Sequence, residues 1–194
     1  MQPTVPPPAR AGHVPGEAGV WVLILGDIFA FSAFFAVFLL HRAQNVALFS
    51  VSQATLERGF GLLNTALLLT SSLFVARAVL AARAGAARAS ARLLIFALAC
   101  GGGFVVSKGF EWGAKIASGI TLNTNEFYSF YYMFTGIHLL HVLVGMGVLT
   151  YLLARSRRSD PGVSYVAVME GGGAFWHMVD LIWVVLFAVF YLLR

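Results

Sequence analysis

The sequence predicts an all-α membrane protein, a polytopic bundle of five transmembrane helices. Of its 194 residues, 59% are hydrophobic and only 11% are charged, whereas a soluble domain carries about 25% charged residues. The mean hydropathy is +0.83. Five apolar stretches are each long enough to cross about 30 Å of hydrocarbon as a helix, and they lack the alternation of a barrel strand. These observations exclude a soluble monomer and a disordered chain.

The N-terminal segment, Met1 to Ala18, is rich in proline and has neither the basic start nor the apolar core of a secretory signal. We expect a flexible tail there. The rest of the chain, residues 19 to 194, is expected to form one membrane domain. Its predicted spans cover residues 19–41, 60–81, 93–117, 127–154 and 166–193.

Short connections join the predicted spans and leave no room for a soluble domain. They comprise residues 42–59, 82–92, 118–126 and 155–165, the last marked as a turn by Asp160-Pro161-Gly162. Glycine runs at 101–103 and 171–173 lie within the third and fifth spans. Because small residues let membrane helices approach closely, the runs favour helix contact over a hinge.

The positive charges are distributed unevenly between the two ends of the predicted bundle. One end carries Arg10, Arg83, Arg88, Arg92, Arg155, Arg157 and Arg158, and the other carries Arg42, Arg58, Lys115 and Arg194. The positive-inside rule therefore predicts a cytoplasmic N-terminus and a C-terminus outside. The net charge of +5 comes from scattered residues and not from a basic tract, so no nucleic-acid partner is expected.

Ionisable residues within the spans are costly and need a partner or a purpose. Asp27 has no cation within one turn of its own helix. Two explanations of a carboxyl group at this position are equally good. Asp27 is either a protonatable group that faces a neighbouring helix or a lipid cleft, or a neutral carboxyl group that is hydrogen-bonded to another helix. Lys108, Glu111 and Lys115 form one stripe on the third span, and an ion pair between Lys108 and Glu111 is favoured over an ion pathway.

Polar residues also share faces on the last two spans. His138 and His141 stand three apart on the fourth, and Glu170, His177 and Asp180 share a face of the fifth, with Trp176 and Trp183 beside them. Histidines and carboxylates can form a metal site in a bundle, but the Glu-x-x-His pairs of iron sites are absent. An interhelical hydrogen-bond network is therefore predicted, with no bound metal or haem.

Five motifs occur in an order that identifies a family. They are W-V-L-I-L-G-D (21–27), L-L-N-T (62–65), K-G-F-E-W (108–112), T-G-I-H-L-L-H-V (135–142) and W-H-M-V-D-L-I-W (176–183). Together they resemble subunit III of the haem-copper oxidases, such as cytochrome c oxidase, from about Gly19 to the end of the chain. Five predicted spans match the short bacterial forms, which lack the two N-terminal helices that form one arm of the lipid-filled cleft in the long form.

A narrower resemblance points to the subunit III relative that is associated with bacterial nitric oxide reductases. It is carried by H-V-P-G-E (13–17), L-L-L-T-S-S (67–72) and E-G-G-G (170–173). The resemblance predicts an accessory role in denitrification. The alternative is subunit III of an aerobic cytochrome c or quinol oxidase.

The resemblance implies a non-catalytic, multi-pass subunit of the bacterial inner membrane. Such a subunit has no haem or metal of its own, packs against the haem-bearing catalytic subunit I, binds phospholipid, and supports assembly, stability and proton uptake. Asp27 stands where the family commonly has a membrane-embedded Glu, which makes it the protonatable candidate. The residues expected to fix helix packing and lipid headgroups are Asn64, Lys108, Glu111, His138, His141, Glu170, His177, Asp180 and Trp183.

Two functions of other classes stay open from the residues alone. A stand-alone proton or ion carrier would use Asp27, Lys108 and Glu111 as its path. A metal or haem enzyme would be built on His138, His141 and His177.

Overall fold

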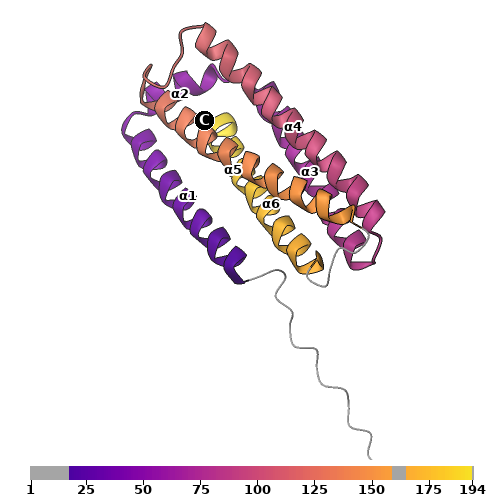
Figure 1. Cartoon of the computed structure of the whole chain (residues 1–194). Helices are drawn as coiled ribbons and strands as arrows, with labels where there is room; N and C mark the ends of the chain where they lie inside the picture. Colours follow the sequence, from indigo (N-terminus) through magenta and orange to yellow (C-terminus); the bar gives the residue numbers. More distant parts are fainter. Residues whose placement is uncertain (1–17, 159–164, 194) are drawn as a thin grey trace, which may run out of the picture.

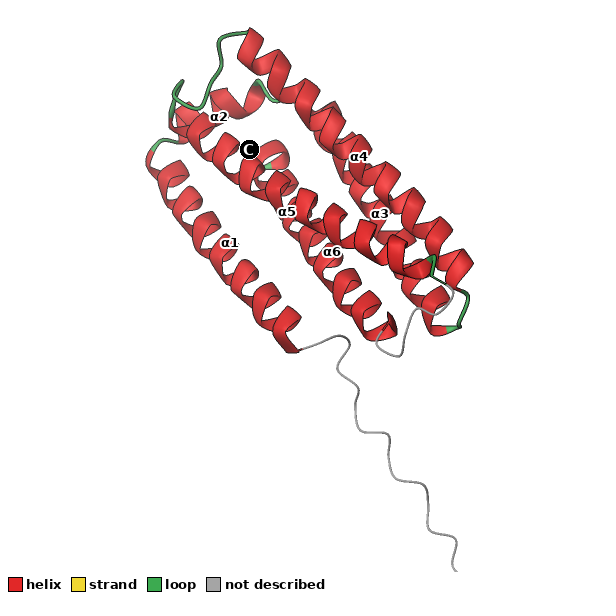
Figure 2. Ribbon diagram, in the orientation of Figure 1, coloured by secondary structure: helices red, strands yellow, loops and turns green. Residues whose placement is uncertain are grey.

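The computed structural model describes residues 18–158 and 165–193, and all regular structure in them is helical. Five helices are long and apolar enough to cross a membrane, which confirms the predicted fold class (Figure 2). They are α1 (Ala18–Gln44), α3 (Arg58–Arg83), α4 (Ala87–Ala117), α5 (Glu126–Ser156) and α6 (Tyr165–Phe187). A short helix, α2 (Val46–Ala54), and a π-helical turn, η1 (Ala188–Leu192), complete the described part. The turn at 160–162 and the predicted proline-rich tail lie outside it, except for Ala18, which was assigned to the tail and is the first residue of α1.

The helices extend beyond the predicted spans at several ends. The segment from Ala87 to Arg92, assigned to a connection, is the first part of α4, and Arg83 and Arg155 are also helical. Alanine and arginine are strong helix formers, so the backbone stays helical after the apolar stretch has ended. The predicted connection 42–59 likewise contains α2, a helix too short to give a membrane-span signal.

Two helix ends are fixed by glycine in the left-handed region. Gly85 follows α3 with φ +73° and Gly119 follows α4 with φ +76°. At the end of α3, the Gly85 N–H donates to Ala82 O at 3.0 Å and the Ala86 N–H donates to Ala81 O at 2.9 Å. This pair of bonds is the Schellman arrangement, which satisfies carbonyls that the helix leaves open. It reverses the chain tightly, so α4 packs antiparallel to α3.

The central helix of the bundle is α6. Figure 1 shows it between α1 on one side and α3 and α4 on the other. In the apolar stretch of α6 that could span a membrane, 61% of an 18-residue segment is buried, whereas the corresponding share for α1 is 17%. The fully buried Trp176 projects from α6 towards Gly101 of α4 and Gly145 of α5, where an added Cβ would lie 3.2 Å and 2.7 Å from the indole.

The predicted role of the glycine runs in helix contact is confirmed for four residues. An added Cβ at Gly101, Gly103, Gly172 or Gly173 would meet a side chain of another helix at 2.8–3.4 Å. At Gly102 it would meet nothing within 4 Å. Gly101 faces α5 and α6 whereas Gly103 faces α3, and Gly172 faces α5 whereas Gly173 faces α3, so each run allows close approach on two sides of its helix.

Phenylalanine rings attach α1 to α5. Phe35 stacks on Phe134 with ring centroids 5.3 Å apart, and Phe38 meets Phe130 edge-on at 5.6 Å. Such pairs contribute about 0.5–1.5 kcal/mol each beyond the area they bury. The opposite face of α1 is open, and Phe29 is 76% exposed there. In a membrane this face meets lipid or another protein.

The short helix α2 covers the end of the bundle where α6 finishes. Its fully buried Phe49 packs edge-on against Phe38 of α1 and Phe127 of α5. The Gln53 amide donates to Val189 O in η1 at 2.9 Å. These contacts position the π-helical turn and, with it, the side chain of Tyr191.

Candidate functional site

Lys108 and Glu111 lie inside the bundle and form the centre of a four-residue cluster. Lys108 is 0% exposed and Glu111 is 2% exposed. Lys108 Nζ lies 2.8 Å from Glu111 Oε2, which confirms the ion pair predicted from their spacing. Nζ also lies 3.1 Å from the hydroxyl oxygens of Tyr131 and Tyr191. Both hydroxyls donate to Glu111 Oε1, at 2.6 Å and 2.5 Å.

Every polar atom of this polar cluster, defined as Lys108, Glu111, Tyr131 and Tyr191, has a partner. The three ammonium protons go to one carboxylate oxygen and two hydroxyls, and the two carboxylate oxygens together accept three bonds. Removing charges from water is unfavourable unless the geometry satisfies them fully. The cluster therefore joins α4, α5 and η1 through a satisfied ion pair.

Lys115 continues the stripe of Lys108 and Glu111 towards the end covered by α2. Its Nζ donates to Thr55 O at 3.2 Å. A cavity of about 200 Å³ opens beside it and reaches Glu111, with Glu57 and Thr55 in its wall. The carboxylate of the polar cluster thus lies close to a polar opening at this end.

His138 is fully buried but does not form the predicted interhelical hydrogen bond. In the described part of the chain, neither of its ring nitrogens has a hydrogen-bond partner. The ring packs between Phe104 and Trp183, with centroid distances of 5.7 Å and 5.3 Å. Aromatic packing replaces the expected polar contact because the facing positions on α4 and α6 are a phenyl and an indole.

Asn64 and Trp183 lie at the contact of α3 with α6. The Trp183 indole N–H donates to Thr65 Oγ1 at 3.1 Å, which links the two helices. Asn64 is 0% exposed, and its amide has no hydrogen-bond partner among the described residues. Lys108 Nζ lies over the ring of Trp183, 5.2 Å from the ring centroid.

Two of the three polar residues predicted to share a face of α6, Glu170 and His177, contact α3. Glu170 Oε1 accepts from Arg83 Nε at 2.8 Å. His177 Nδ1 lies 2.5 Å from Ser72 Oγ. The carboxylate oxygens of the buried Asp180 have no hydrogen-bond partner among the described residues, so Asp180 does not form the predicted bond. The predicted network therefore consists of separate contacts between the two helices. Glu170 and His177 also line a cavity of about 370 Å³ between α1, α3 and α6.

Asp27 of α1 lies close to His141 of α5. Its Oδ1 lies 3.4 Å from His141 Nε2, a contact that the sequence did not predict because the residues are on different helices. His141 Nδ1 bonds to the Ile137 carbonyl at 2.8 Å and must be the donor there. In a neutral ring Nε2 then has no hydrogen of its own and faces the carboxyl group of Asp27. The side chains are 26% and 20% exposed, beside a small cavity lined by Leu23 and Phe175.

The geometry does not gather these residues into a metal centre. Within residues 18–158 and 165–193, no group of three or more His, Cys, Asp or Glu side chains is arranged to hold a metal ion. His138 and His141 are divided between an aromatic contact and the pair with Asp27, and His177 faces Ser72. The arrangement offers helix packing, a carboxyl group facing an imidazole at Asp27 and His141, and several cavities that open between the helices.

Comparison with known proteins agrees with the motifs. A probable cytochrome c oxidase subunit 3 of Nocardia farcinica is 28% identical over 180 residues, covering 92% of this chain and 88% of its own. The cytochrome c oxidase subunit 3 of Thermostichus vulcanus is 30% identical over 179 residues, which are 90% of this chain and 86% of that protein. A heme-copper oxidase subunit I+III of Aeropyrum pernix is 26% identical over 185 residues, which are 91% of this chain and 22% of that protein. The family model for cytochrome c oxidase subunit III matches residues 15–194, so the chain belongs to the cytochrome c oxidase subunit III family, whose members are non-catalytic subunits.

Proposed function

We propose that this chain is subunit III of an oxygen-reducing haem-copper oxidase and acts by supporting the haem-bearing catalytic subunit. The observation that carries the proposal is the family match across residues 15–194, which includes every described helix. The Aeropyrum pernix relative combines subunits I and III in one name. A chain in which the two are joined supports direct contact between them, and we extend this contact to the present chain.

The names of the relatives favour an oxidase over the nitric oxide reductase context predicted from the narrower motifs. The proteins of Nocardia farcinica and Thermostichus vulcanus are both called cytochrome c oxidase subunit 3. The E-G-G-G run that suggested the reductase serves packing in this structure, because Gly172 and Gly173 lie against α5 and α3. Cytochrome c is therefore our proposed electron donor for the complex.

The supporting role rests on a rigid bundle that carries its own lipid-facing openings. The polar cluster fixes α4, α5 and η1 together, while α1 is attached mainly through phenyl rings. Between α1, α5 and α6 lies a cavity of about 380 Å³ lined by apolar residues such as Val20, Val148 and Phe175. Acyl chains match this lining, and we propose that bound phospholipid joins α1 to the rest of the bundle.

Within this role, the Asp27 and His141 pair is our candidate for the protonatable site. The pair brings a carboxyl group and an imidazole together, 3.4 Å apart, at the partly exposed edge of the bundle. We propose that it influences proton uptake by the catalytic subunit and is not part of a channel through this chain. The polar cluster, in contrast, is satisfied internally, which argues against the ion-carrier alternative.

The arginine-rich end of the bundle is proposed to face the cytoplasm. Arg83, Arg88, Arg92, Arg155, Arg157 and Arg158 lie where α3 ends, α4 begins and α5 ends. The other end carries Arg42, Arg58 and Lys115. This asymmetry supports the orientation through the positive-inside rule.

Affinity purification in mild detergent tests the proposed partner. The tagged chain is isolated, the co-eluting proteins are identified by mass spectrometry, and an optical spectrum of the eluate is recorded. We expect an oxygen-reducing catalytic subunit in stoichiometric amount with its haem absorption. Recovery of the catalytic subunit of a nitric oxide reductase instead would show that the chain belongs to a nitric oxide reductase and not to an oxygen-reducing oxidase. Elution of the colourless chain alone, from cells that express the oxidase, would contradict the proposal.

A further inference from the structure

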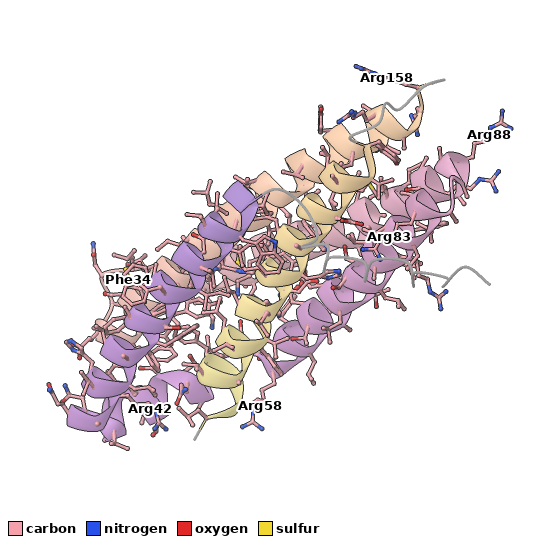
Figure 3. All side chains as sticks on the ribbon, turned by 90° about the horizontal axis from the view of Figure 1, so that it is seen from below. Phe34, Arg42, Arg58, Arg83, Arg88 and Arg158 are labelled. Carbon is pink, nitrogen blue, oxygen red and sulfur yellow. The ribbon has the colours of Figure 1, made fainter. Side chains whose placement is uncertain are left out.

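A polar cavity of about 200 Å³ lies where α3 begins and α4 ends. The polar residues in its wall are Thr55, Glu57, Glu111, Lys115 and Ser118. Figure 3 shows Arg58, the residue after Glu57, at the end of the bundle opposite Arg88 and Arg158. The cavity therefore opens at the end of the bundle that α2 covers, and it leads inward to the polar cluster.

The charged groups in the wall of this cavity balance one another. Lys115 and Glu57 contribute one charge of each sign, and Glu111 is paired with Lys108 at 2.8 Å. Neither a cation nor an anion that entered would meet an excess of the opposite charge. The wall therefore favours a small neutral ligand that forms hydrogen bonds.

Two buried groups in the wall have hydrogen-bonding capacity left over. Lys115 is 8% exposed, and among the described residues its ammonium group makes one hydrogen bond, to Thr55 O at 3.2 Å. An ammonium group has three protons, so two of them remain. The Glu111 carboxylate accepts three bonds from the other members of the polar cluster, whereas a carboxylate offers about four acceptor positions. Buried polar groups usually complete their hydrogen bonds with protein or with ordered water.

The cavity has room for water, and aromatic rings close the polar cluster at its inner end. One water molecule takes about 30 Å³ in the liquid, so several fit. Along α4, Lys115, Glu111, Lys108 and Phe104 follow one another at intervals of about one turn. The fully buried Phe104 meets Trp183 edge-on with ring centroids 4.8 Å apart, directly beyond Lys108. Water that enters from the open end thus reaches the ion pair and stops there.

We propose that this cavity binds water, which bridges Lys115 to Glu111 and connects the buried ion pair with the aqueous phase at one end of the bundle. The donor is the Lys115 ammonium group. The acceptor is Glu111 Oε2, which otherwise accepts from Lys108 alone. Water in this position completes the hydrogen bonds of both side chains and is part of the folded structure. The polar cluster then exchanges protons with this end of the bundle only, which agrees with a chain that is not an ion carrier.

Radiolytic footprinting of the purified full-length chain in detergent tests the proposed water site. Hydroxyl radicals that form from bound water oxidise the side chains beside it, even where these are buried. The readout is the oxidation of Tyr191 and Tyr131, which are 4% and 0% exposed, measured by mass spectrometry and normalised to the intrinsic reactivity of each ring. Phe134 on α5, also 0% exposed, is the dry reference. We expect both tyrosines to be oxidised at least about fivefold faster than Phe134.

A variant that fills the cavity provides the second arm of the test. Ala114 lines the cavity, so Ala114→Leu should exclude water, whereas Ala117→Leu adds the same side chain at an exposed position of α4 outside the wall. We expect oxidation of the tyrosines to fall at least about threefold in Ala114→Leu and to stay within about 1.5-fold of the wild type in Ala117→Leu. Thermal unfolding confirms that each variant is folded.

Two results would overturn the proposal. One is oxidation of both tyrosines no faster than that of Phe134 in the wild type. The other is unchanged oxidation in the folded Ala114→Leu variant. Neither result would bear on the proposed oxidase partner, which the affinity purification tests separately.

Discussion

At the scale of single residues, two charged pairs in the same bundle have different surroundings. Lys108 and Glu111 are buried and fully bonded, whereas Asp27 and His141 lie at a partly exposed edge. Breaking a buried pair leaves a charge without compensation, while a partly exposed pair contributes little. The two pairs should therefore respond very differently to the loss of one partner.

Lys108→Met is expected to destabilise the chain by about 3 kcal/mol, because it leaves the Glu111 carboxylate buried without its cation. Lys108→Met combined with Glu111→Gln should recover a large part of this loss, since no charge then remains. Reversible unfolding in mixed micelles measures both. A double variant no more stable than Lys108→Met would show that the pair is not coupled.

Asp27→Asn is expected to change the free energy of unfolding by less than about 1 kcal/mol, as for other partly exposed pairs. The same unfolding assay applies, with wild type and Lys108→Met as references. A loss as large as that of Lys108→Met would mean that Asp27 has a structural role, and it would remove the basis for treating it as a free protonatable site.

At the scale of helices, the sequence predicts the apolar lengths well and the ends less well. The spans were located because each is a predominantly apolar stretch long enough to cross the membrane as a helix, but the start of α4 was placed at residue 93 and not at Ala87. Hydropathy marks the membrane boundary, whereas helix propensity and the Gly85 turn determine where the helix begins. The helix α2 escaped prediction because nine residues give no membrane signal.

Gly145→Ala should destabilise the contact between α5 and α6. Its added Cβ would lie 2.7 Å from the fully buried Trp176, and overpacking of this kind costs about 1–3 kcal/mol. Gly147→Ala on the same helix is the control, because its Cβ would meet nothing within 4 Å. Unfolding of the two variants measures the difference. Equal stability would show that the close approach at Gly145 is absent in the membrane.

At the scale of the whole molecule, the family and the number of spans followed from the sequence, but most contacts between helices did not. Tyr191 is 80 residues from Glu111, and Asp27 meets His141 across two helices. No periodicity within one helix encodes such pairs. The ion pair between Lys108 and Glu111 was predictable because the two residues lie three positions apart on one helix. His138 was expected to bond and instead packs on aromatic rings, since the facing residues could not be read from its own helix.

The orientation of the bundle gives a prediction at this scale. Cys100 is the only cysteine, so single cysteines can be introduced into a Cys100→Ser background. We expect Ala84→Cys, between α3 and α4, to react with a membrane-impermeant maleimide only after the cytoplasmic side is opened. Ser118→Cys, at the opposite end, should react in intact spheroplasts. The reverse pattern would place the arginine-rich end outside.

The central claim is that this chain supports a catalytic subunit and does not itself carry the chemistry. The most direct test is to purify the oxidase from cells with and without the chain, and to measure haem content, initial rate and activity during prolonged turnover. The account predicts equal haem content per catalytic subunit and a similar initial rate, with faster loss of activity when the chain is missing. Full activity that persists through prolonged turnover without the chain would contradict it.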